Sequence, residues 1–504
     1  MIEVEDKFRV HADFELPALH SADGPVTVVS TPRRQTLTAV YYDTEDLRLA
    51  RVGVTVRHRS GEGEGKDGWT LKLPVTGART GVREELHEDA PAGEVPARFR
   101  TLLTACVRRG LLEERATVRT ERTAMDLLGA DGQVLAEVVD DRVDALTADH
   151  HVARFREIEV EDRLGGSAVL DHVGGLLRDA GAVAGEFQPK VVRALGPEAG
   201  APPSPPAPAP VTLRDPASVL VASTLRTHVR ALLDHDPWAR LGADDAVHQM
   251  RVSARRLRSA LRDLADLVEP SWGTWAQDEL RWLGAALSTS RNAEVLRSRL
   301  EDVLGSLDPD LVTDRVAPRL FAVLDADATE GHAQLEAALS SDRYLNLLEE
   351  LVDAATQPRT TDAADSPCSE VAPGLVRASW RRLAKRAAAT RREDATEEQY
   401  HRARIAAKRT RYLAESLVPV YGRPAKRFAR RVEAVQEVLG EHQDTVVARA
   451  LLHRAATEPR VGRAAFTFGV MYCQEEQAAR SARSRFQQLW PKLARARHRR
   501  WIDR

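Results

Sequence analysis

"EVEDKF", residues 3–8, carries the alternation that decides the fold of the first half of this chain. Its charged residues Glu3, Glu5 and Lys7 occupy every second position. On an extended strand, side chains two residues apart project from the same face. A single strand of this kind ordinarily turns its charged face to solvent. A set of such strands closed around a common interior would instead enclose the charges.

The same two-residue period recurs along the first 165 residues. We expect strands at 2–10, 36–43, 52–59, 68–74, 82–88, 117–126, 134–143 and 153–161. The alternate positions carry charge in nearly all of them, and the opposite positions are mostly apolar, as at Phe8, Leu71 and Ile158. Eight strands are enough to close a barrel without free edges. The pattern predicts an eight-stranded antiparallel β tunnel with a charged interior and an apolar outside covered by helices.

Enclosed charges of this kind need a neutralising ligand, because desolvating each ion costs several kcal/mol. Clustered carboxylates are ligands for Mg²⁺ or Mn²⁺, and lysine and arginine donors suit phosphate oxygens. A divalent metal with a phosphate chain would satisfy both signs at once.

The charged segments resemble, in order, the CYTH superfamily of triphosphate tunnel metalloenzymes. The matching segments are "EVEDK" (the ExExK signature), "YYDTEDLRLARVGVTVRHR", "WTLKL", "AEVVDDRV", "REIEVE" and "QPKVVRAL". The resemblance covers residues 1–195 and implies metal-dependent transformation of triphosphates. It implies catalytic roles for Glu3, Glu5, Lys7 and Lys190. It implies metal ligation by Glu3, Glu5, Asp141, Glu157, Glu159 and Glu161. It implies triphosphate binding by Lys7, Arg57, Arg59, Lys72, Arg83, Arg122 and Lys190.

Two inward positions have competing candidates. Arg119 competes with Arg122, and Asp140 competes with Asp141. Strand parity favours Arg122 and Asp141, and a β-bulge would reverse that choice.

A proline-rich stretch, "GPEAGAPPSPPAPAP" at 196–210, separates this module from a second one, and we expect a linker at 196–211. Beyond it the period changes to 3.6, which predicts an all-α domain over 212–504. "AVHQMRVSARRLRSALRDLADLV" and "YHRARIAAKRTRYLAESL" match each other at an offset of 153 residues. The second module is therefore expected to be a duplicated four-helix bundle, with copies at about 212–353 and 373–500. The whole chain is predicted to be an α+β multi-domain protein.

Each copy carries a basic stripe. His248, Arg251, Arg255 and Arg258 fall on one helical face, and the second copy repeats the stripe. Like charges at these spacings repel, and a bound polyanion would relieve the repulsion. The repeats, with "VLGEHQD", resemble the CHAD domain, which implies binding of inorganic polyphosphate. The implied ligands are His248, Arg251, Arg255, Arg258, His401, Arg404, Lys408, Arg409, Arg411 and His442. Ser290 and Asn292 replace His442 and Asp444 in the first copy, which predicts either weaker binding there or a role mainly in completing the pore.

Charge and composition bound the remaining choices. Residues 371–504 carry 30 Lys and Arg against 13 Asp and Glu, which suits a polyanionic partner. The three cysteines form no CxxC pair, and neither a signal peptide nor a membrane span is expected, so a cytoplasmic protein is predicted, with association with polyphosphate granules left open.

The preferred function is metal-dependent hydrolysis of triphosphate or polyphosphate. The alternatives are an adenylyl cyclase, a thiamine triphosphatase and a non-catalytic protein that targets polyphosphate granules. Nucleic-acid binding is supported only by the basic C-terminal segment.

Overall fold

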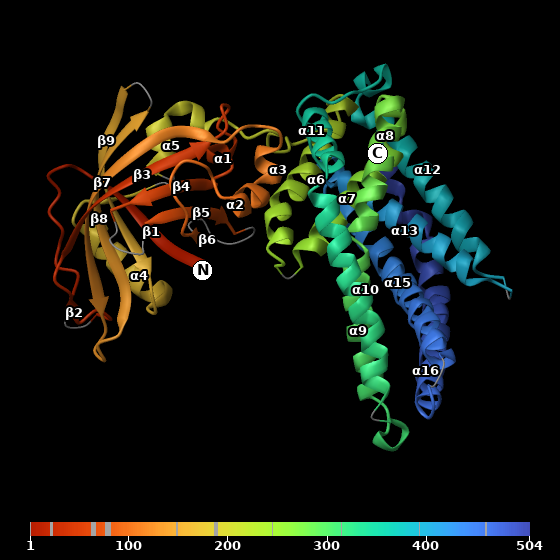
Figure 1. The fold of residues 1–504 in the computed structure, drawn as a ribbon. Coiled ribbons are helices and arrows are strands. Elements are labelled where there is room, and N and C mark those ends of the chain that lie inside the picture. Colours follow the sequence, from red (N-terminus) through yellow and green to blue (C-terminus); the bar gives the residue numbers. More distant parts are fainter. Residues whose placement is uncertain are drawn as a thin grey trace. The chain divides into compact units, whose positions relative to one another are not determined.

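The computed structural model forms two compact units, Met1–Ser204 and Pro205–Arg504 (Figure 1). It describes residues 2–20, 24–61, 67–75, 82–147, 150–185, 190–243, 245–313, 315–392, 394–458 and 461–503. The side chains of residues 2, 3, 150–152, 289–294 and 503 lie outside this description.

The first unit is a closed antiparallel barrel, which confirms the predicted fold class. The hydrogen-bonded order is β1-β6-β5-β4-β3-β7-β8-β9, and β1 pairs with β9 to close it. The barrel strands are β1 (Ile2–Val10), β3 (Arg33–Asp43), β4 (Thr55–Ser60), β5 (Gly68–Pro74), β6 (Val82–Glu88), β7 (Glu113–Leu128), β8 (Val134–Thr147) and β9 (His150–Asp162). Two short strands, β2 (Val28–Val29) and β10 (Val183–Ala184), pair with β7 and β1.

Apolar side chains on the outside of the barrel are covered. Helix α4 (Gly166–Asp179) packs Val173 and Leu177 into one buried cluster with Phe8, Ile158 and Val160 of the strands. These three strand residues alternate with the charged positions of β1 and β9, as the two-residue period requires. Helices α1 (Arg48–Arg51), α2 (Ala97–Leu102) and α3 (Thr104–Val107) lie in the connections between strands.

One end of the barrel interior is apolar. Helix α5 (Lys190–Leu195) buries Val191 and Val192 in a cluster that includes Tyr41, Val118 and Val143. Tyr41 lies opposite Arg57 on the neighbouring strand, and Val143 is two residues from Asp141, so these side chains share the inward face with the charged residues. Helix α5 therefore closes off part of the interior with apolar side chains.

The second unit is all-helical and internally duplicated. Its first copy holds α6 (Ala217–Arg240), α7 (Ala246–Asp263), α8 (Pro270–Ala286), α9 (Thr289–Gly305), α10 (Val316–Leu339) and α11 (Asp342–Thr356). Its second copy holds α12 (Cys368–Ala389), α13 (Glu397–Ser416), α14 (Val418–Tyr421), α15 (Arg423–Thr457) and α16 (Ala464–Leu493). The single helix α15 corresponds in sequence to α8 and α9 together. A buried apolar cluster joins α9 and α10 to α15 and α16.

The segments that lead into the first helix of each copy pair with each other. Pro216 and Pro367 form an antiparallel bridge. The amide of Ala217 donates to the Ser366 carbonyl at 2.9 Å, and the amide of Cys368 donates to the Asp215 carbonyl at 2.9 Å. This reciprocal pairing of equivalent positions is what a tandem duplication of one bundle produces.

The proline-rich segment packs at both ends. Ala199, in the short 3₁₀ helix η1 (Pro197–Gly200), is buried in the barrel cluster around α5. The carbonyls of Pro205 and Ala209 accept hydrogen bonds from Arg230 and Ser223 of α6, each at 3.0 Å. Proline lacks a donor but keeps its carbonyl acceptor, so both ends of the expected 196–211 linker can contact the unit next to them.

Among the described helices, none combines the length and the apolar composition needed to cross a membrane.

Candidate functional sites

Strand register brings the inward charges of β1, β8 and β9 side by side. Glu5 lies opposite Glu161, and Lys7 opposite Glu159. On the other side of β9, Glu157 lies opposite Asp141. Directly opposed residues in an antiparallel pair have Cβ atoms about 5 Å apart, so closure of the barrel concentrates carboxylates in one wall.

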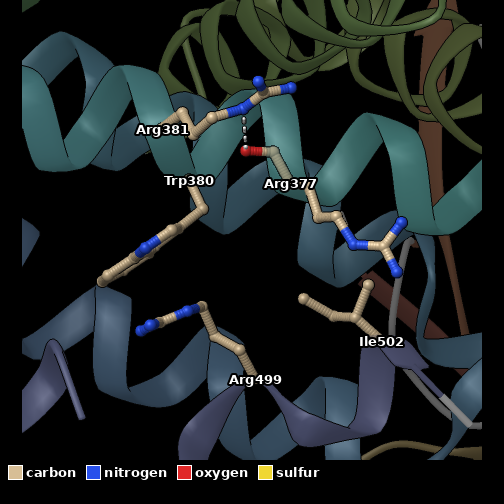
Figure 2. A pocket seen from close by; sticks show the side chains of 5 residues that line it. All are labelled: Arg377, Trp380, Arg381, Arg499 and Ile502. Atoms are coloured by element: carbon tan, nitrogen blue, oxygen red, sulfur yellow. Dashed lines mark hydrogen bonds between the residues drawn. The ribbon is translucent and has the colours of Figure 1, made fainter. Parts of the chain in front are cut away.

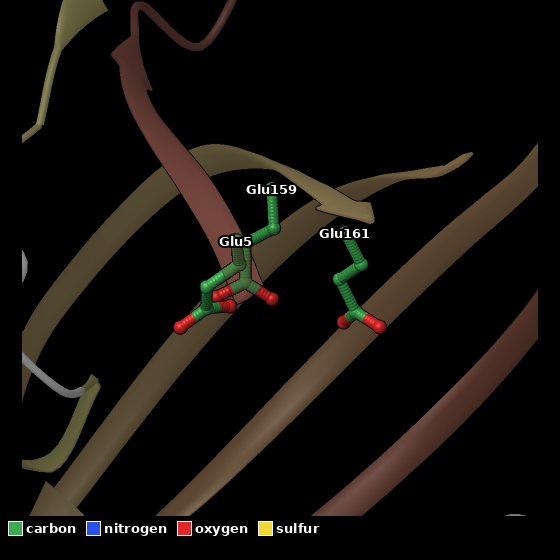
Figure 3. A group of neighbouring side chains, drawn as sticks. All are labelled: Glu5, Glu159 and Glu161. Carbon is green, nitrogen blue, oxygen red and sulfur yellow. The ribbon is translucent and has the colours of Figure 1, made fainter. Parts of the chain in front are cut away.

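Three of these carboxylates form a group that fits a metal ion. Oxygens of Glu5, Glu159 and Glu161 lie within 4.8 Å of one another (Figure 3). Glu5 and Glu159 are buried. Glu5 Oε1 is 3.2 Å from the Lys7 ammonium but accepts no hydrogen bond. A buried carboxylate oxygen with free acceptor capacity, beside two more carboxylates, suits a hard divalent cation.

The other predicted metal ligands with described side chains, Asp141 and Glu157, are also paired with cations, as Glu159 and Glu161 are. Lys190, at the start of α5, places its ammonium 2.8 Å from Asp141 and 3.0 Å from Glu157. Arg122 adds two hydrogen bonds to Asp141, at 2.9 and 2.7 Å, and Arg193 approaches Glu157 at 3.4 Å. Asp141 and Glu157 thus lie beside the three-carboxylate group without joining it. The side chain of Glu3 lies outside the described residues.

These pairings hold the groups in their charged forms. Burial by itself raises the pKa of Glu159, but Lys190 and Lys7 outweigh it and hold that pKa well below its usual value. Burial likewise opposes the charge on Lys190, yet Asp141 and Glu159 raise its pKa well above the ordinary one. Glu159 and Lys190 therefore stay ionised around neutral pH.

The remaining predicted phosphate ligands line neighbouring strands. Arg57 Nη1 donates to the Tyr41 hydroxyl at 3.1 Å, while its Nε is buried without a hydrogen-bond partner. Lys72 pairs with Glu85 at 3.1 Å. Burial by itself raises the pKa of Glu85, but the charges of Lys72 and Arg57 outweigh it and lower that pKa to about 2. Arg83, Arg59 and Lys7 belong to the same inward set by register. Arg83 and Lys7 are buried, and Arg59 is half-buried.

The observed register agrees with the choice made from strand parity. Arg122 faces inward to Asp141, whereas Arg119 is exposed. Asp140 turns the other way and receives two hydrogen bonds from Arg156, at 2.8 and 2.7 Å. The bulges of β7 and β8 lie outside this part of the strands, between Leu127 and Leu128 and between Ala145 and Leu146.

In the helical unit, the two basic stripes meet. Arg255 of α7 donates to the Tyr412 hydroxyl of α13 at 3.2 Å. Burial, followed by the positive charges of Arg404, Arg255 and Arg251, lowers the pKa of Lys408 to about 7. Cations from both copies therefore converge on one region. The sequence pattern of each stripe alone did not predict that the two stripes lie side by side.

Nearby carboxylates neutralise only part of this region. Arg411 is paired with Glu415 at 2.6 Å and with Glu433 at 2.7 Å. Arg404 is half-buried, and its Nε has no hydrogen-bond partner. Burial raises the pKa of Asp444 although Arg404 opposes the shift. Arg409 and Arg258 are half-buried, and burial followed by Arg262 lowers the pKa of Arg258.

The histidines occupy different settings. His442 is 2% exposed, its ring lies 4.8 Å from that of Tyr400, and its Nε2 accepts a hydrogen bond from Arg483 Nε at 2.9 Å. Burial, followed by the charge of Arg483, lowers the pKa of His442 to about 4. As a neutral, buried hydrogen-bond acceptor, His442 orients Arg483 and does not offer a positive charge to a ligand. The sequence analysis did not single out Arg483. His401 Nδ1 contacts Gln443 Oε1 at 2.6 Å, and His248 is half-buried on α7.

Two further arginines form ion pairs that no sequence motif indicated. Arg193 lies over the Phe155 ring at 3.5 Å and approaches Glu157. Arg299 pairs with Glu475 at 2.7 Å, 176 residues away. Both are ordinary positions on amphipathic helices until tertiary contacts give them partners. The side chains of Ser290 and Asn292 are not among those described.

The chain thus joins a barrel that encloses a carboxylate group and basic side chains to a duplicated helical unit in which two basic stripes converge. Family comparison agrees: a CYTH domain matches residues 1–173 and a CHAD domain matches residues 223–453. The chain belongs to the family of proteins that join a CYTH domain to a CHAD domain. CYTH tunnel domains are metal-dependent, and the carboxylate group described above fits that property.

Relatives and solved structures extend the comparison. The chain is similar to the uncharacterized protein Rv2226 of Mycobacterium tuberculosis (strain ATCC 25618 / H37Rv), with 34% identity over 524 aligned residues, 98% of this chain and 97% of the relative. PptA from Streptomyces chartreusis is 24% identical with a TM-score of 0.47, covering 55% of this chain and 100% of that one. The CHAD domain from the plant Ricinus communis is 26% identical with a TM-score of 0.44, covering 56% of this chain and 96% of that one.

Proposed function

We propose that the barrel hydrolyses inorganic triphosphate or polyphosphate ends with a divalent metal, Mg²⁺ or Mn²⁺, and that the helical unit binds polyphosphate. The observation that carries the proposal is the group of Glu5, Glu159 and Glu161 inside a barrel that also encloses Arg57, Lys72 and Arg122. Carboxylates supply the metal site, and guanidinium and ammonium groups supply the phosphate site.

The side chains divide the work by position. Arg57 has an unused buried Nε donor, and with Lys72 and Arg122 it would hold the nonbridging oxygens of the phosphate chain. Lys7 and Lys190 would offset the charge that develops during displacement, as the transition state requires. Glu5, Glu159 and Glu161 would hold a cation that, when bound, lowers the pKa of a coordinated water and neutralises phosphate charge. Glu3 belongs to the proposed set by strand parity.

The position of the aromatic side chains favours naked phosphate over nucleotides or thiamine triphosphate. Trp69 is 1% exposed and donates from its indole nitrogen to the Pro91 carbonyl, on the face of β5 opposite to Lys72. Tyr42 packs against Trp69 at 4.9 Å, also on the outer face. Tyr41 faces inward, with its hydroxyl already bonded to Arg57. A base or thiazole would find little to stack on.

The helical unit would anchor long chains. Arg251, Arg255, Arg404 and Lys408 come together from two helices, and their mutual repulsion would be relieved by a polyanion. Arg258, His248, His401, Arg409 and Arg411 would extend this surface. His442 would act by orienting Arg483. Binding at this surface would fall with rising salt.

The test is a phosphate-release panel on the full chain with tripolyphosphate, long-chain polyphosphate, ATP and thiamine triphosphate, with and without Mg²⁺. Glu161→Gln should lower metal-dependent release from tripolyphosphate by at least about 100-fold, since it removes a charged ligand. Glu121→Gln, on an exposed outward position of β7, is the matched control and should stay within about twofold. Equal activity in both variants, or faster turnover of ATP than of tripolyphosphate, would count against the proposal.

A further inference from the structure

A pocket in the helical unit is lined by residues that belong to neither basic stripe. It is lined by Arg377, Trp380 and Arg381 of α12 and by Arg499 and Ile502 near the end of the described chain, and its volume is about 450 Å³ (Figure 2). Arg499 directly precedes the short 3₁₀ helix η6 (Arg500–Asp503), which carries Ile502. Three of the five lining residues are arginines.

Aromatic packing holds one wall of the pocket in place. Trp380 stacks on Trp490 of α16, with ring centroids 5.4 Å apart and an interplanar angle of 12°. The Arg499 guanidinium lies 4.0 Å from the Trp380 ring centroid. A nucleobase could stack on Trp380 only by displacing one of these groups. The pocket therefore offers charge and hydrogen-bond donors rather than an open aromatic surface.

The arginines keep donors available. Arg381 Nε donates to the Arg377 carbonyl at 3.4 Å, and Arg499 Nη1 donates to the Ala494 carbonyl at 3.0 Å. Among the residues that the structure describes, neither guanidinium forms an ion pair with a carboxylate. A guanidinium carries five N–H donors, so one backbone contact leaves most of them for a ligand.

Further positive charge gathers beside the pocket. Partial burial, followed by the charges of Arg431, Arg497 and Arg495, lowers the pKa of His498, the neighbour of Arg499. Such an accumulation of cations is relieved by an anion, and planar guanidinium groups match phosphate oxygens in geometry.

The pocket lies apart from the part of the polyphosphate surface where Arg404 and Lys408 lie beside Asp444, whereas Arg411, at the edge of that surface, pairs with Glu433, which is closer to Phe428 on α15. Phe428, whose ring lies 6.0 Å from that of Trp380, precedes Asp444 on α15 by 16 residues. At 1.5 Å per residue, this is about 24 Å along the helix axis.

We propose that this pocket is a second anion site of the helical unit, which binds a short inorganic phosphate chain such as pyrophosphate or tripolyphosphate. The inference does not depend on hydrolysis in the barrel. A short chain could arrive free or as the end of a longer polymer, and the two sources share the same phosphate chemistry.

Hydrogen exchange on the full chain locates the binding event without interference from the other phosphate sites. With EDTA present, pyrophosphate and tripolyphosphate should slow amide exchange in 374–384 and 494–503. Arg381→Gln should raise the concentration needed for this protection about tenfold, because one charge-assisted contact is lost. Arg381→Gln with Arg499→Gln should abolish the protection. The paired change Arg454→Gln with Arg463→Gln, at exposed positions near the other end of α15, removes the same charge and should leave it unchanged.

Arg381 makes no described aromatic contact, so the single variant retains the packing of Trp380, and an unchanged thermal transition would verify this. Long-chain polyphosphate should protect the same segments if chain ends enter the pocket. Absence of protection by pyrophosphate and tripolyphosphate in the unaltered chain would overturn the proposal. The proposal would also be overturned if the control pair lost the protection equally, or if only long chains gave protection. Protection by ATP at lower concentrations than by tripolyphosphate would overturn it as well.

Discussion

Individual lysines explain how the barrel tolerates its interior charge. Lys190 reaches Asp141, Glu157 and Glu159 within 3.0 Å, and Lys7 contacts Glu5 and Glu159. The carboxylates of Asp141, Glu157 and Glu159 thus have cationic protein partners before any ligand binds. The expectation that only a metal–phosphate ligand could neutralise the interior was too strict, because the ligand would join a network that is already largely paired.

The pairing of Arg122 with Asp141 predicts an unequal response of two neighbouring arginines. Arg122→Gln removes two hydrogen bonds to a fully buried carboxylate and should lower the free energy of unfolding by about 3 kcal/mol. Arg119→Gln changes an exposed position of the same strand and should stay within about 0.5 kcal/mol. Calorimetry of the full chain measures both, and similar destabilisation would contradict the inward assignment of Arg122.

The low pKa of Lys408 predicts pH-dependent polyphosphate binding. In the free protein its pKa is about 7, lowered by burial and by Arg404, Arg255 and Arg251, with Asp444 opposing. A bound polyanion favours the ammonium form and raises this pKa, so binding takes up a proton and affinity falls as pH rises above 7.

Calorimetric titrations at pH 6.5 and 8.5, in buffers of different ionisation enthalpy, measure this proton uptake. Lys408→Arg keeps the charge at every pH and should flatten the profile. A pH dependence that persists unchanged in this variant would assign the titration to another group.

At the scale of elements, strand pairing and helix continuity position both sites. The register of β1, β8 and β9 aligns the carboxylates, and α5 places Lys190 among them while its valines fill one end of the interior. In the helical unit, α15 runs unbroken where the first copy has α8 and α9. The long helix carries His442 and Asp444 past α13, whose basic stripe lies beside them.

A glycine in α15 gives a prediction at this scale. A Cβ added to Gly440 would meet only Arg404 Nε, at 3.8 Å, which is ordinary contact. Gly440→Ala should therefore raise the free energy of unfolding by about 0.5–1 kcal/mol through reduced entropy of the unfolded chain. Gly284→Ala in α8, where a Cβ meets nothing within 4 Å, should do the same. A loss of stability in Gly440→Ala alone would mean that Arg404 needs the space.

For the whole molecule, tethering two phosphate-binding units predicts dependence on chain length. An anchored polymer raises the effective concentration of its ends at the barrel, to about the millimolar range for a short linker. Residues 205–211 pack with the helical unit, so the deletion that separates the units removes 205–504. The barrel keeps its own core.

Deleting 205–504 should raise KM for long-chain polyphosphate by about tenfold or more and leave KM for tripolyphosphate within about twofold. Steady-state phosphate release with both substrates measures the difference. Equal changes for the two substrates would contradict a capturing role of the helical unit.

The sequence by itself determined which residues share a face and that the second unit is a duplicated helical domain. Its two-residue period separated Arg122 from Arg119 and Asp141 from Asp140, because side-chain direction on a strand depends only on local position. The match between two stretches 153 residues apart predicted the two helical copies, because similar sequences form similar elements.

Tertiary structure alone decided which charges meet. Glu5, Glu159 and Glu161 form the three-carboxylate group, and Glu159 is also paired with Lys7 and Lys190. Asp141 and Glu157 lie outside that group and are paired with Lys190, Arg122 and Arg193. Likewise, His442 is buried against Tyr400, and Arg381 and Arg499 line one pocket from segments more than 100 residues apart. These partners are set by barrel closure and helix packing between distant segments, which no local period encodes.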